Sequence, residues 1–258
     1  MNNFFFGIYP YIALSVMIFG SIARYERDPF TWKSSSSQLL RRKQLVLGSI
    51  LFHVGVLTIL VGHVAGLLTP VWIIDALGIG HAFKQVVAMT VGGIAGVMAL
   101  IGGGMLFHRR WTDPRIRKTS SVADIGILGL LLLQLLLGVS TIFASARHLD
   151  GHEMLKFMHW AQGILTFRPD AAAQIADVAL IFKLHIVCGL TIFLLFPFTR
   201  LVHMLSVPVR YFWRPGYQIV RSRRTTPLPS HSDAEIARAK VASAKAAPAG
   251  PRAPSLAE

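Results

Sequence analysis

The sequence has a single cysteine, Cys188, and only 12 acidic residues against 26 basic ones. One cysteine cannot form a disulfide within the chain, and it cannot supply the thiolate set that an iron-sulfur cluster or a structural zinc site needs. Charged residues make up 15% of the chain and hydrophobic residues 53%, and the mean hydropathy is +0.54. A soluble domain of this size is more polar, so the composition predicts a membrane protein.

Five apolar stretches are long enough to cross a bilayer. A spanning helix needs roughly 20 apolar residues, because the hydrocarbon core is about 30 Å thick. The stretches cover residues 4–23, 44–74, 85–107, 125–146 and 178–199, and only the last is interrupted, by Lys183. The sequence therefore predicts an all-α membrane protein with five transmembrane helices in a bundle. The first stretch is expected to be retained, since no basic segment precedes it as in a signal peptide.

Basic residues are distributed unequally between the loops. They are concentrated in residues 24–43, in residues 108–121 and after the fifth stretch, whereas residues 75–84 contain one lysine and residues 147–177 carry more acidic than basic side chains. Loops rich in Lys and Arg remain cytoplasmic, so the N-terminus is expected outside and the C-terminus in the cytoplasm. Topology and anionic membrane lipid account for the net charge of +14, and we expect no nucleic-acid binding.

The chain is expected to have two parts. Residues 1–224 contain all five apolar stretches and form the membrane domain. Residues 225–258 are poor in large apolar side chains and rich in Ala and Pro. This composition cannot bury a core, so the sequence predicts a disordered cytoplasmic tail with at most a short helix near residues 233–246.

Four histidines lie within the apolar stretches or at their ends. His53 and His63 are in the second stretch, and His185 and His203 are in or just beyond the fifth. Ionisable groups in a bilayer are costly and usually mark function. Because the second and fifth helices run in opposite directions, we expect His63 to lie opposite His185 and His53 to lie opposite His203.

Helix geometry supports this pairing in part. His185 and His203 are five full turns apart and share one face, whereas His53 and His63 diverge by about 80° around the helix axis. The axial separations also differ, at about 15 Å for the second helix and about 27 Å for the fifth. A bend at Pro197 would shorten the longer one.

Two opposed imidazoles in lipid suit haem iron. Zinc and copper normally need three or four protein ligands, whereas haem iron takes two axial ligands and the apolar macrocycle suits a bundle interior. Without a CxxCH motif, such a haem is non-covalent b type. Glycines near the histidines leave room for either a flat ligand or a neighbouring helix; they are Gly55, Gly62, Gly66 and Gly189.

Two other classes of protein remain open on the residues alone. A haem-free proton-relay transporter would use intramembrane histidines as a proton path. A structural membrane anchor would tolerate the loss of all four histidines. A colourless protein would favour one of these two classes.

Several segments together resemble a known family. They are FFFGIYPYIA, RYERDPFTWKSSSSQLLRRK, LFHVGVLTILVGHVAGLLTP and LHIVCGLTIFLLFPFTRLVHMLSVPVRY. The chain resembles, over roughly residues 1–224, the gamma subunit of membrane-bound respiratory nitrate reductase, a dihaem cytochrome b that oxidises quinol. The resemblance implies that His63 and His185 hold the outer haem b, and that His53 and His203 hold the inner one.

The resemblance also implies a quinol site at the outer haem. It places Lys84 there as a group that binds a quinol oxygen, with Gly62 and His63 close by. The ordinary reading of Lys84 is an interfacial lysine that extends its ammonium group to water. Lys183 is expected either to do the same or to meet a haem propionate.

The partners implied by the resemblance lie on the cytoplasmic face. They are an iron-sulfur beta subunit and a molybdenum-containing alpha subunit that reduces nitrate, and the clusters and the molybdenum cofactor belong to those subunits alone. The implied location is the bacterial cytoplasmic (inner) membrane, with several spans. The nearest alternative is a related cytochrome b subunit that serves a sulfur-compound reductase, which a different cytoplasmic partner would distinguish.

Overall fold

The computed structural model of the protein describes residues 1–32, 42–206, 213, 235–236 and 238–242. The chain divides into two units, Met1–Val207 and Pro208–Glu258. In the second unit, residues 235–236 and 238–242 are helical and exposed, within the stretch where the sequence permits a short helix. The predicted domain boundary between residues 224 and 225 and the predicted disorder around this helix lie outside the described residues.

Five helices of the first unit are long and apolar enough to cross a membrane, and no strand occurs among the described residues. The candidate spans are Phe4–Arg27, Arg42–Leu68, His81–Thr112, Val122–Ser145 and Leu180–Phe198. Each span overlaps one of the five predicted stretches. The prediction of an all-α protein with five apolar helices of membrane-spanning length is confirmed.

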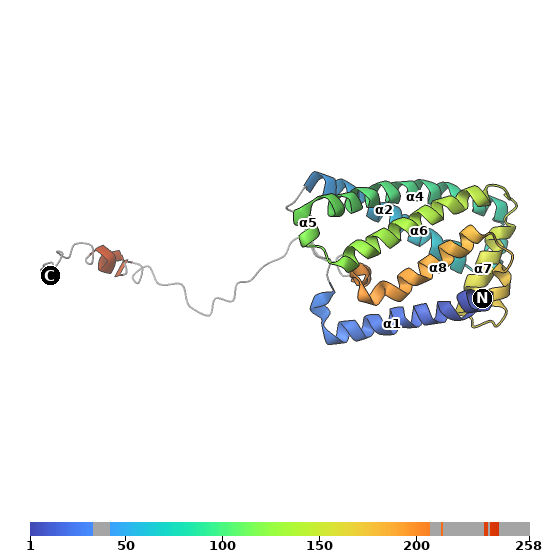
Figure 1. The fold of residues 1–258 in the computed structure, drawn as a ribbon, viewed down its shortest axis with the longest axis horizontal. Coiled ribbons are helices and arrows are strands. Elements are labelled where there is room, and N and C mark those ends of the chain that lie inside the picture. The colour runs from blue at the N-terminus through green and yellow to red at the C-terminus, as the bar shows by residue number, and fades with distance from the viewer. Residues whose placement is uncertain (33–41, 207–212, 214–234, 237, 243–258) are drawn as a thin grey trace, which may run out of the picture. The chain divides into compact units, whose positions relative to one another are not determined.

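The long helices are joined by short helices and turns (Figure 1). The long ones are α1 (Tyr9–Arg27), preceded by the π-helix η1 (Phe4–Ile8), and α2 (Arg42–Leu68), α4 (His81–Thr112), α6 (Val122–Ser145) and α8 (Leu180–Leu195). The short helices are α3 (Val71–Ala76), α5 (Pro114–Lys118) and α7 (His152–Leu165). The 3-10 turns are η2 (Pro29–Thr31), η3 (Ala171–Ile175), η4 (Phe196–Phe198) and η5 (Arg200–Leu205).

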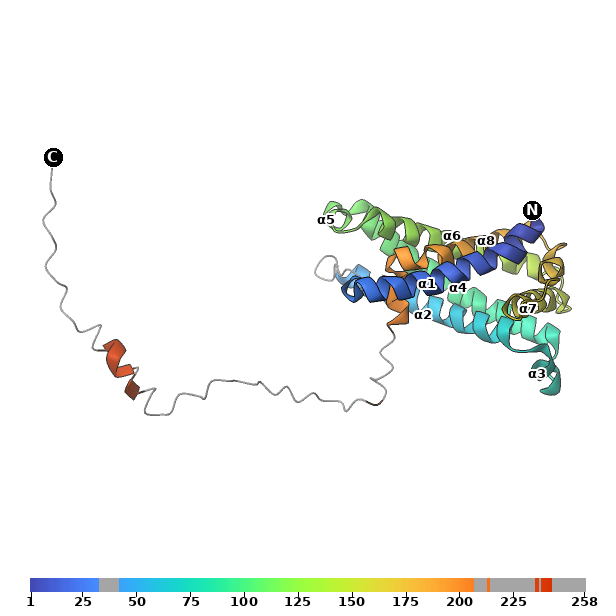
Figure 2. The same ribbon diagram turned by 90° about the horizontal axis from the view of Figure 1, so that it is seen from below.

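The long helices pack in the order α2, α4, α6, α8, α1. They lie side by side, with α3 and α7 at one end of the bundle and α5 at the other (Figures 1 and 2). We call these the α7 end and the α5 end. Helix α2 packs along α4, and α8 packs along α6 and α1. Helices α2 and α8 do not pack along each other, so side chains have to bridge them.

Glycine sets the closest of these helix contacts, between α2 and α4. A Cβ at Gly55 would lie 2.6 Å from the Ala95 carbonyl oxygen and 2.8 Å from the Ala99 nitrogen. Gly48 and Gly102 face each other in the same way farther along the two helices. Small residues let helix backbones approach this closely. Gly55 therefore serves helix packing, which is the second of its two expected roles.

Three local features differ from the sequence-based expectations. Helix α2 ends at Leu68 rather than at residue 74, because Pro70 follows and starts α3 instead. Helix α4 begins at His81, where Gly80 provides an extended N-cap, so Lys84 lies inside the first turns of a helix and not in a loop. Helix α7 forms within the long connection at residues 147–177, for which we predicted no helix.

Helix α7 ties the α7 end together with polar side chains. Gln162 donates through Nε2 to the carbonyl groups of Leu67 (3.0 Å), in the last turn of α2, and of Thr69 (2.9 Å), just after it. Trp160 donates through Nε1 to the Phe6 carbonyl of η1 at 2.9 Å. The two bonds from Gln162 satisfy carbonyl groups that the C-terminal end of α2 leaves open. On the exposed side, a hydrogen bond to Asp177 raises the pKa of Lys156.

The α2 and α4 contact yields a prediction for stability. Gly55→Ala should lower the free energy of unfolding by about 1–3 kcal/mol, because the new methyl group forces the two backbones apart. The midpoint of thermal unfolding of the detergent-purified protein measures this effect. Gly92→Ala on α4 is the matched control, since its Cβ would meet no atom within 4 Å. Equal midpoints for the two variants would contradict the assigned contact.

Candidate functional site

The four predicted histidines come together as two pairs that bridge α2 and the α8 to η5 segment. The ring centres of His53 and His203 lie 6.4 Å apart, with an interplanar angle of 70°. Those of His63 and His185 lie 6.2 Å apart, at 40°. The structure therefore places side by side the same partners that antiparallel packing leads us to expect.

A break in the last helix makes the pairing possible. Helix α8 ends at Leu195, and the 3-10 turn η4 contains Pro197. Thr199 is extended, with φ −119° and ψ 179°, and η5 then carries His203. The bend expected near Pro197 is present, and it separates the segment of His203 from the segment of His185.

Three of the four imidazoles are fixed by a backbone carbonyl in their own helix or turn. The Nδ1 atoms of His53 and His63 lie 2.7 Å from the Ser49 oxygen and 2.9 Å from the Ile59 oxygen, one turn earlier in α2. Nδ1 of His203 lies 2.5 Å from the Arg200 oxygen. A carbonyl can only accept, so each Nδ1 carries the proton and each Nε2 keeps its lone pair for a metal.

His185 has a different environment, which sequence reasoning missed. Its Nδ1 is buried without a hydrogen-bond partner, and its Nε2 lies 3.4 Å from Nε2 of Gln134 in α6. A Cβ at Gly138 would lie 3.0 Å from the His185 ring, and a Cβ at Gly189 would lie 3.1 Å from Gln134. Gln134 interrupts the apolar run LLLLQLLLG, and that lone amide was the available signal. Gln134 and Gly138 thus form the wall behind this imidazole.

The spacing of both pairs fits a bis-histidine haem. A metal-to-imidazole bond is about 2 Å long, and each ring centre lies about 1 Å beyond its ligating nitrogen, so two axial imidazoles need ring centres about 6 Å apart. The observed values are 6.4 Å and 6.2 Å. The residues present therefore fit the group that the sequence predicts.

Two glycines of α2 near His63 face open space, Gly62 and Gly66. A Cβ at Gly62 or at Gly66 would meet no atom within 4 Å. Gly62 precedes His63 directly, and Gly66 follows it by one turn. A flat ligand can approach a helix closely at such positions. Gly189, by contrast, packs against Gln134.

Lys84 lies among α2, α4 and α7 at the α7 end. Its ammonium group donates to the Gly66 carbonyl oxygen at 2.9 Å and to the Met158 sulfur at 3.1 Å. Gly66 is one turn from His63, so Lys84 belongs to the neighbourhood of the His63 and His185 pair. Lys183 donates to the Ala176 carbonyl oxygen at 2.7 Å, and Ala176 lies in the connection before α8.

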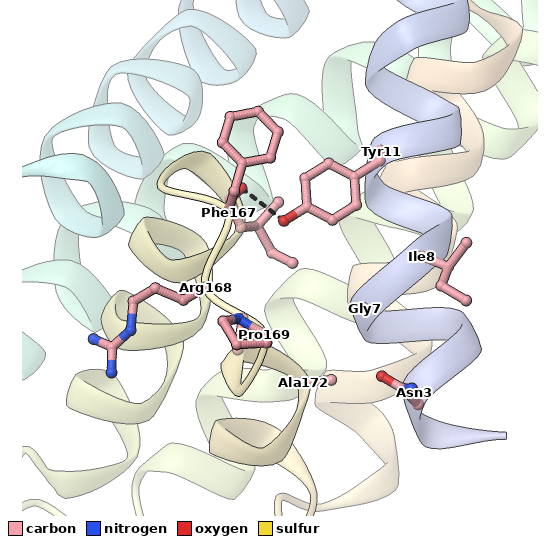
Figure 3. A pocket seen from close by; sticks show the side chains of 10 residues that line it. Asn3, Gly7, Ile8, Tyr11, Phe167, Arg168, Pro169 and Ala172 are labelled. Atoms are coloured by element: carbon pink, nitrogen blue, oxygen red, sulfur yellow. Dashed lines mark hydrogen bonds between the residues drawn. The ribbon is translucent and has the colours of Figure 1, made fainter.

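A separate pocket of about 280 Å³ lies between η1, α1 and the segment after α7. Figure 3 shows Tyr11 and Phe167 on one wall, where their rings stack 5.5 Å apart. Tyr11 also donates to the Ile164 carbonyl at 3.0 Å. None of the four paired histidines lines this pocket, and neither does Lys84. It is distinct from the sites predicted from the sequence.

Comparisons with known proteins identify the family. The family model "Nitrate reductase gamma subunit" matches residues 2–223. The chain belongs to the nitrate reductase gamma subunit family. This family is that of the quinol-oxidising cytochrome b subunits of respiratory nitrate reductase, and it carries haems. The resemblance of the sequence motifs to this family is thereby confirmed.

Individual relatives cover nearly the whole family domain. The respiratory nitrate reductase 2 gamma chain of Escherichia coli K12 is 52% identical over 224 residues, which is 87% of this chain and 98% of the relative. The respiratory nitrate reductase 1 gamma chain of the same organism is 51% identical, over 86% and 98% of the two chains. The nitrate reductase gamma chain of Bacillus subtilis 168 is 43% identical, over 84% and 96%.

The wall behind His185 yields a prediction for activity. Gly138→Val should displace the His185 imidazole from its position opposite His63 and lower the rate of quinol oxidation by about tenfold or more, since errors near 1 Å in a reacting site are this costly. Steady-state oxidation of a quinol analogue by the purified complex measures the effect. Gly126→Val on the same helix is the control, because a Cβ there meets no atom within 4 Å. An unchanged rate in Gly138→Val would exclude this role of the wall.

Proposed function

We propose that the two histidine pairs hold two b haems, His53 with His203 and His63 with His185, and that the chain oxidises quinol at its α7 end and delivers the electrons at its α5 end. The observation that carries this proposal is the spacing of the two pairs, 6.4 Å and 6.2 Å. Bound haem would supply one-electron transfer between the two ends. The chain's own contribution is to hold and orient four imidazoles across the bundle.

The distribution of charge supports an orientation with the α5 end in the cytoplasm. Basic side chains at this end include Arg109, Arg110, Arg115, Arg117 and Lys118. The connections at the α7 end carry the acidic side chains Asp75, Asp150, Glu153, Asp170 and Asp177. Segments rich in Lys and Arg stay on the cytoplasmic side. The N-terminus, at the α7 end, is then outside.

In this orientation the α5 end is the surface that meets partner subunits. A gamma chain of a multisubunit nitrate reductase implies alpha and beta partners. We propose that an iron-sulfur beta subunit docks at the α5 end and passes electrons to a molybdenum-containing alpha subunit that reduces nitrate. Among the described residues, no group of three His, Cys, Asp or Glu side chains lies close enough together to hold a metal ion.

We propose that the quinol site lies at Lys84, beside the pair of His63 and His185. An ammonium group has three donors, and two of them reach Gly66 and Met158. The third can donate to a quinol oxygen, while the open side of Gly62 admits the ring. Protons from the oxidised quinol leave at the α7 end. Each electron that then moves inward moves against the membrane potential, which costs about 2.3 kcal/mol per 100 mV. Part of the free energy of quinol oxidation is therefore stored across the membrane.

The haem assignment predicts which variants lose which haem. His53→Ala and His203→Ala should each abolish one and the same haem, and His63→Ala and His185→Ala should abolish the other. Reduced-minus-oxidised and pyridine-haemochrome spectra of the purified complex count the haems, with two expected in the unmodified chain. If His53→Ala removed the same haem as His185→Ala, the pairing would be wrong. A folded but colourless protein would leave a proton path or a structural anchor instead.

Lys84 predicts a change in quinol affinity. Lys84→Ala should raise the KM for quinol by roughly tenfold to a hundredfold, because a hydrogen bond from a charged group contributes about 1.5–3 kcal/mol. Lys84→Arg should restore part of the affinity. Arg147→Ala removes an exposed charge from the same end of the bundle and is the control. A KM that is equal in Lys84→Ala and Arg147→Ala would remove Lys84 from the site.

A further inference from the structure

Arg24 of α1 binds the backbone at the break that follows α8. Its Nη1 donates to the carbonyl oxygens of Pro197 and Thr199, both at 2.8 Å. Its Nε and Nη2 donate to Thr31 of η2, to the side-chain oxygen at 3.2 Å and to the carbonyl at 2.9 Å. Four of the five guanidinium donors are thus engaged, two of them at the break.

These carbonyl groups need a donor because the helix ends inside the apolar bundle. A continuous helix would satisfy them internally, but Pro197 and the extended Thr199 interrupt the ladder. In a membrane an unsatisfied backbone group costs several kcal/mol. Arg24 supplies both hydrogen bonds from a neighbouring helix, so packing against α1 stabilises the break.

The break leads directly to His203, whose imidazole faces that of His53. The Thr199 hydroxyl oxygen accepts from the Leu201 amide at the start of η5, and the Arg200 carbonyl holds Nδ1 of His203. Leu201 and Val202 are buried in the same apolar cluster as Phe196, and Trp32 packs against it. A shift of the Thr199 backbone would therefore rotate η5 and the ring of His203 with it.

Helix α1 is also shaped for the break at a second position. A Cβ at Gly20 would lie 2.8 Å from Cγ of Pro197. Gly20 precedes Arg24 by one turn, so the same face of α1 receives the proline ring and binds the two carbonyl groups. Arg27, in the last turn of α1, is exposed.

We propose that Arg24 is a positioning residue for His203: it fixes the carbonyl groups of the broken helix, and thereby fixes η5 so that the His203 imidazole faces His53. The inference rests on the proposed function, in which these two histidines ligate one haem. A lysine cannot replace this guanidinium, because a single ammonium point charge does not reproduce the planar fork that spans Thr31 and the break.

The experiment compares Arg24→Ala, Arg24→Lys and Gly20→Ala in the full nitrate reductase complex, with Arg27→Ala as the control. Arg27→Ala removes the same charge from the same end of the same helix, so it tests whether Arg24 acts only through membrane topology. The first readout is the redox titration and the EPR spectrum of each haem. The second is hydrogen exchange of the backbone amides of residues 200–205, which needs no assignment of the haems.

All three variants should shift the midpoint potential and the EPR signal of the haem that His203→Ala abolishes, and leave the other haem unchanged. Amide exchange in residues 200–205 should rise by about tenfold or more in Arg24→Ala, and less in Arg24→Lys. Arg27→Ala should match the unmodified complex in both readouts.

Two results would overturn the proposal. One is unchanged exchange and an unchanged haem signal in Arg24→Ala; the other is an equal effect on both haems in Gly20→Ala and Arg24→Lys, which indicates general unfolding. Failure of the proposed function has a different signature, because His203→Ala would then remove no haem from the complex. The exchange measurement would still report whether Arg24 holds η5.

Discussion

Two helices with different histidine spacings have to meet at two imidazole pairs, and the arrangement of the bundle follows from that constraint. Ten residues of uninterrupted α-helix separate His53 from His63, about 15 Å along the axis. Eighteen residues separate His185 from His203, but α8 ends ten residues after His185, at Leu195. The α-helical part of the second path thus equals the first. The remaining residues turn instead of extending the helix.

The break resolves the angular mismatch as well as the axial one. In a continuous helix His203 would share a face with His185, whereas the two histidines of α2 point in directions about 80° apart. A separate η5 lets His203 approach from its own direction, and the interplanar angles of the two pairs differ accordingly, at 70° and 40°. The break leaves backbone carbonyl groups without a donor in their own helix, and Arg24 donates a hydrogen bond to two of them. In our proposal, α1 thereby contributes to the site although it carries no histidine ligand.

Most of the fold could be predicted from local sequence patterns. The five predicted stretches are apolar runs of the required length, of which only the last is interrupted, by Lys183, and the pairing of the histidines needed only helix direction. The role of Gly55 was not decidable, because one glycine suits a flat ligand and a close helix equally. The roles of Arg24 and Gln134 were not predictable either. Arg24 is one of several basic residues in the predicted loop at residues 24–43, and Gln134 is a single amide among leucines. Their hydrogen-bond partners are 173 and 51 residues away in sequence. Contacts of this kind depend on which helices become neighbours, and periodicity within one helix does not determine that.

The two ends of the bundle are built differently, and the difference gives the proposed reaction its direction. At the α7 end, Lys84 lies among three helices near two glycines whose Cβ positions meet no atom, which suits a substrate that enters and leaves. At the α5 end, the His203 segment is buried against α1, α6 and Trp32, which suits a ligand that stays fixed while electrons pass to the proposed partner. Basic side chains gather at this second end and acidic ones at the first. In the proposed orientation, with the basic loops in the cytoplasm, electrons would move inward against the membrane potential.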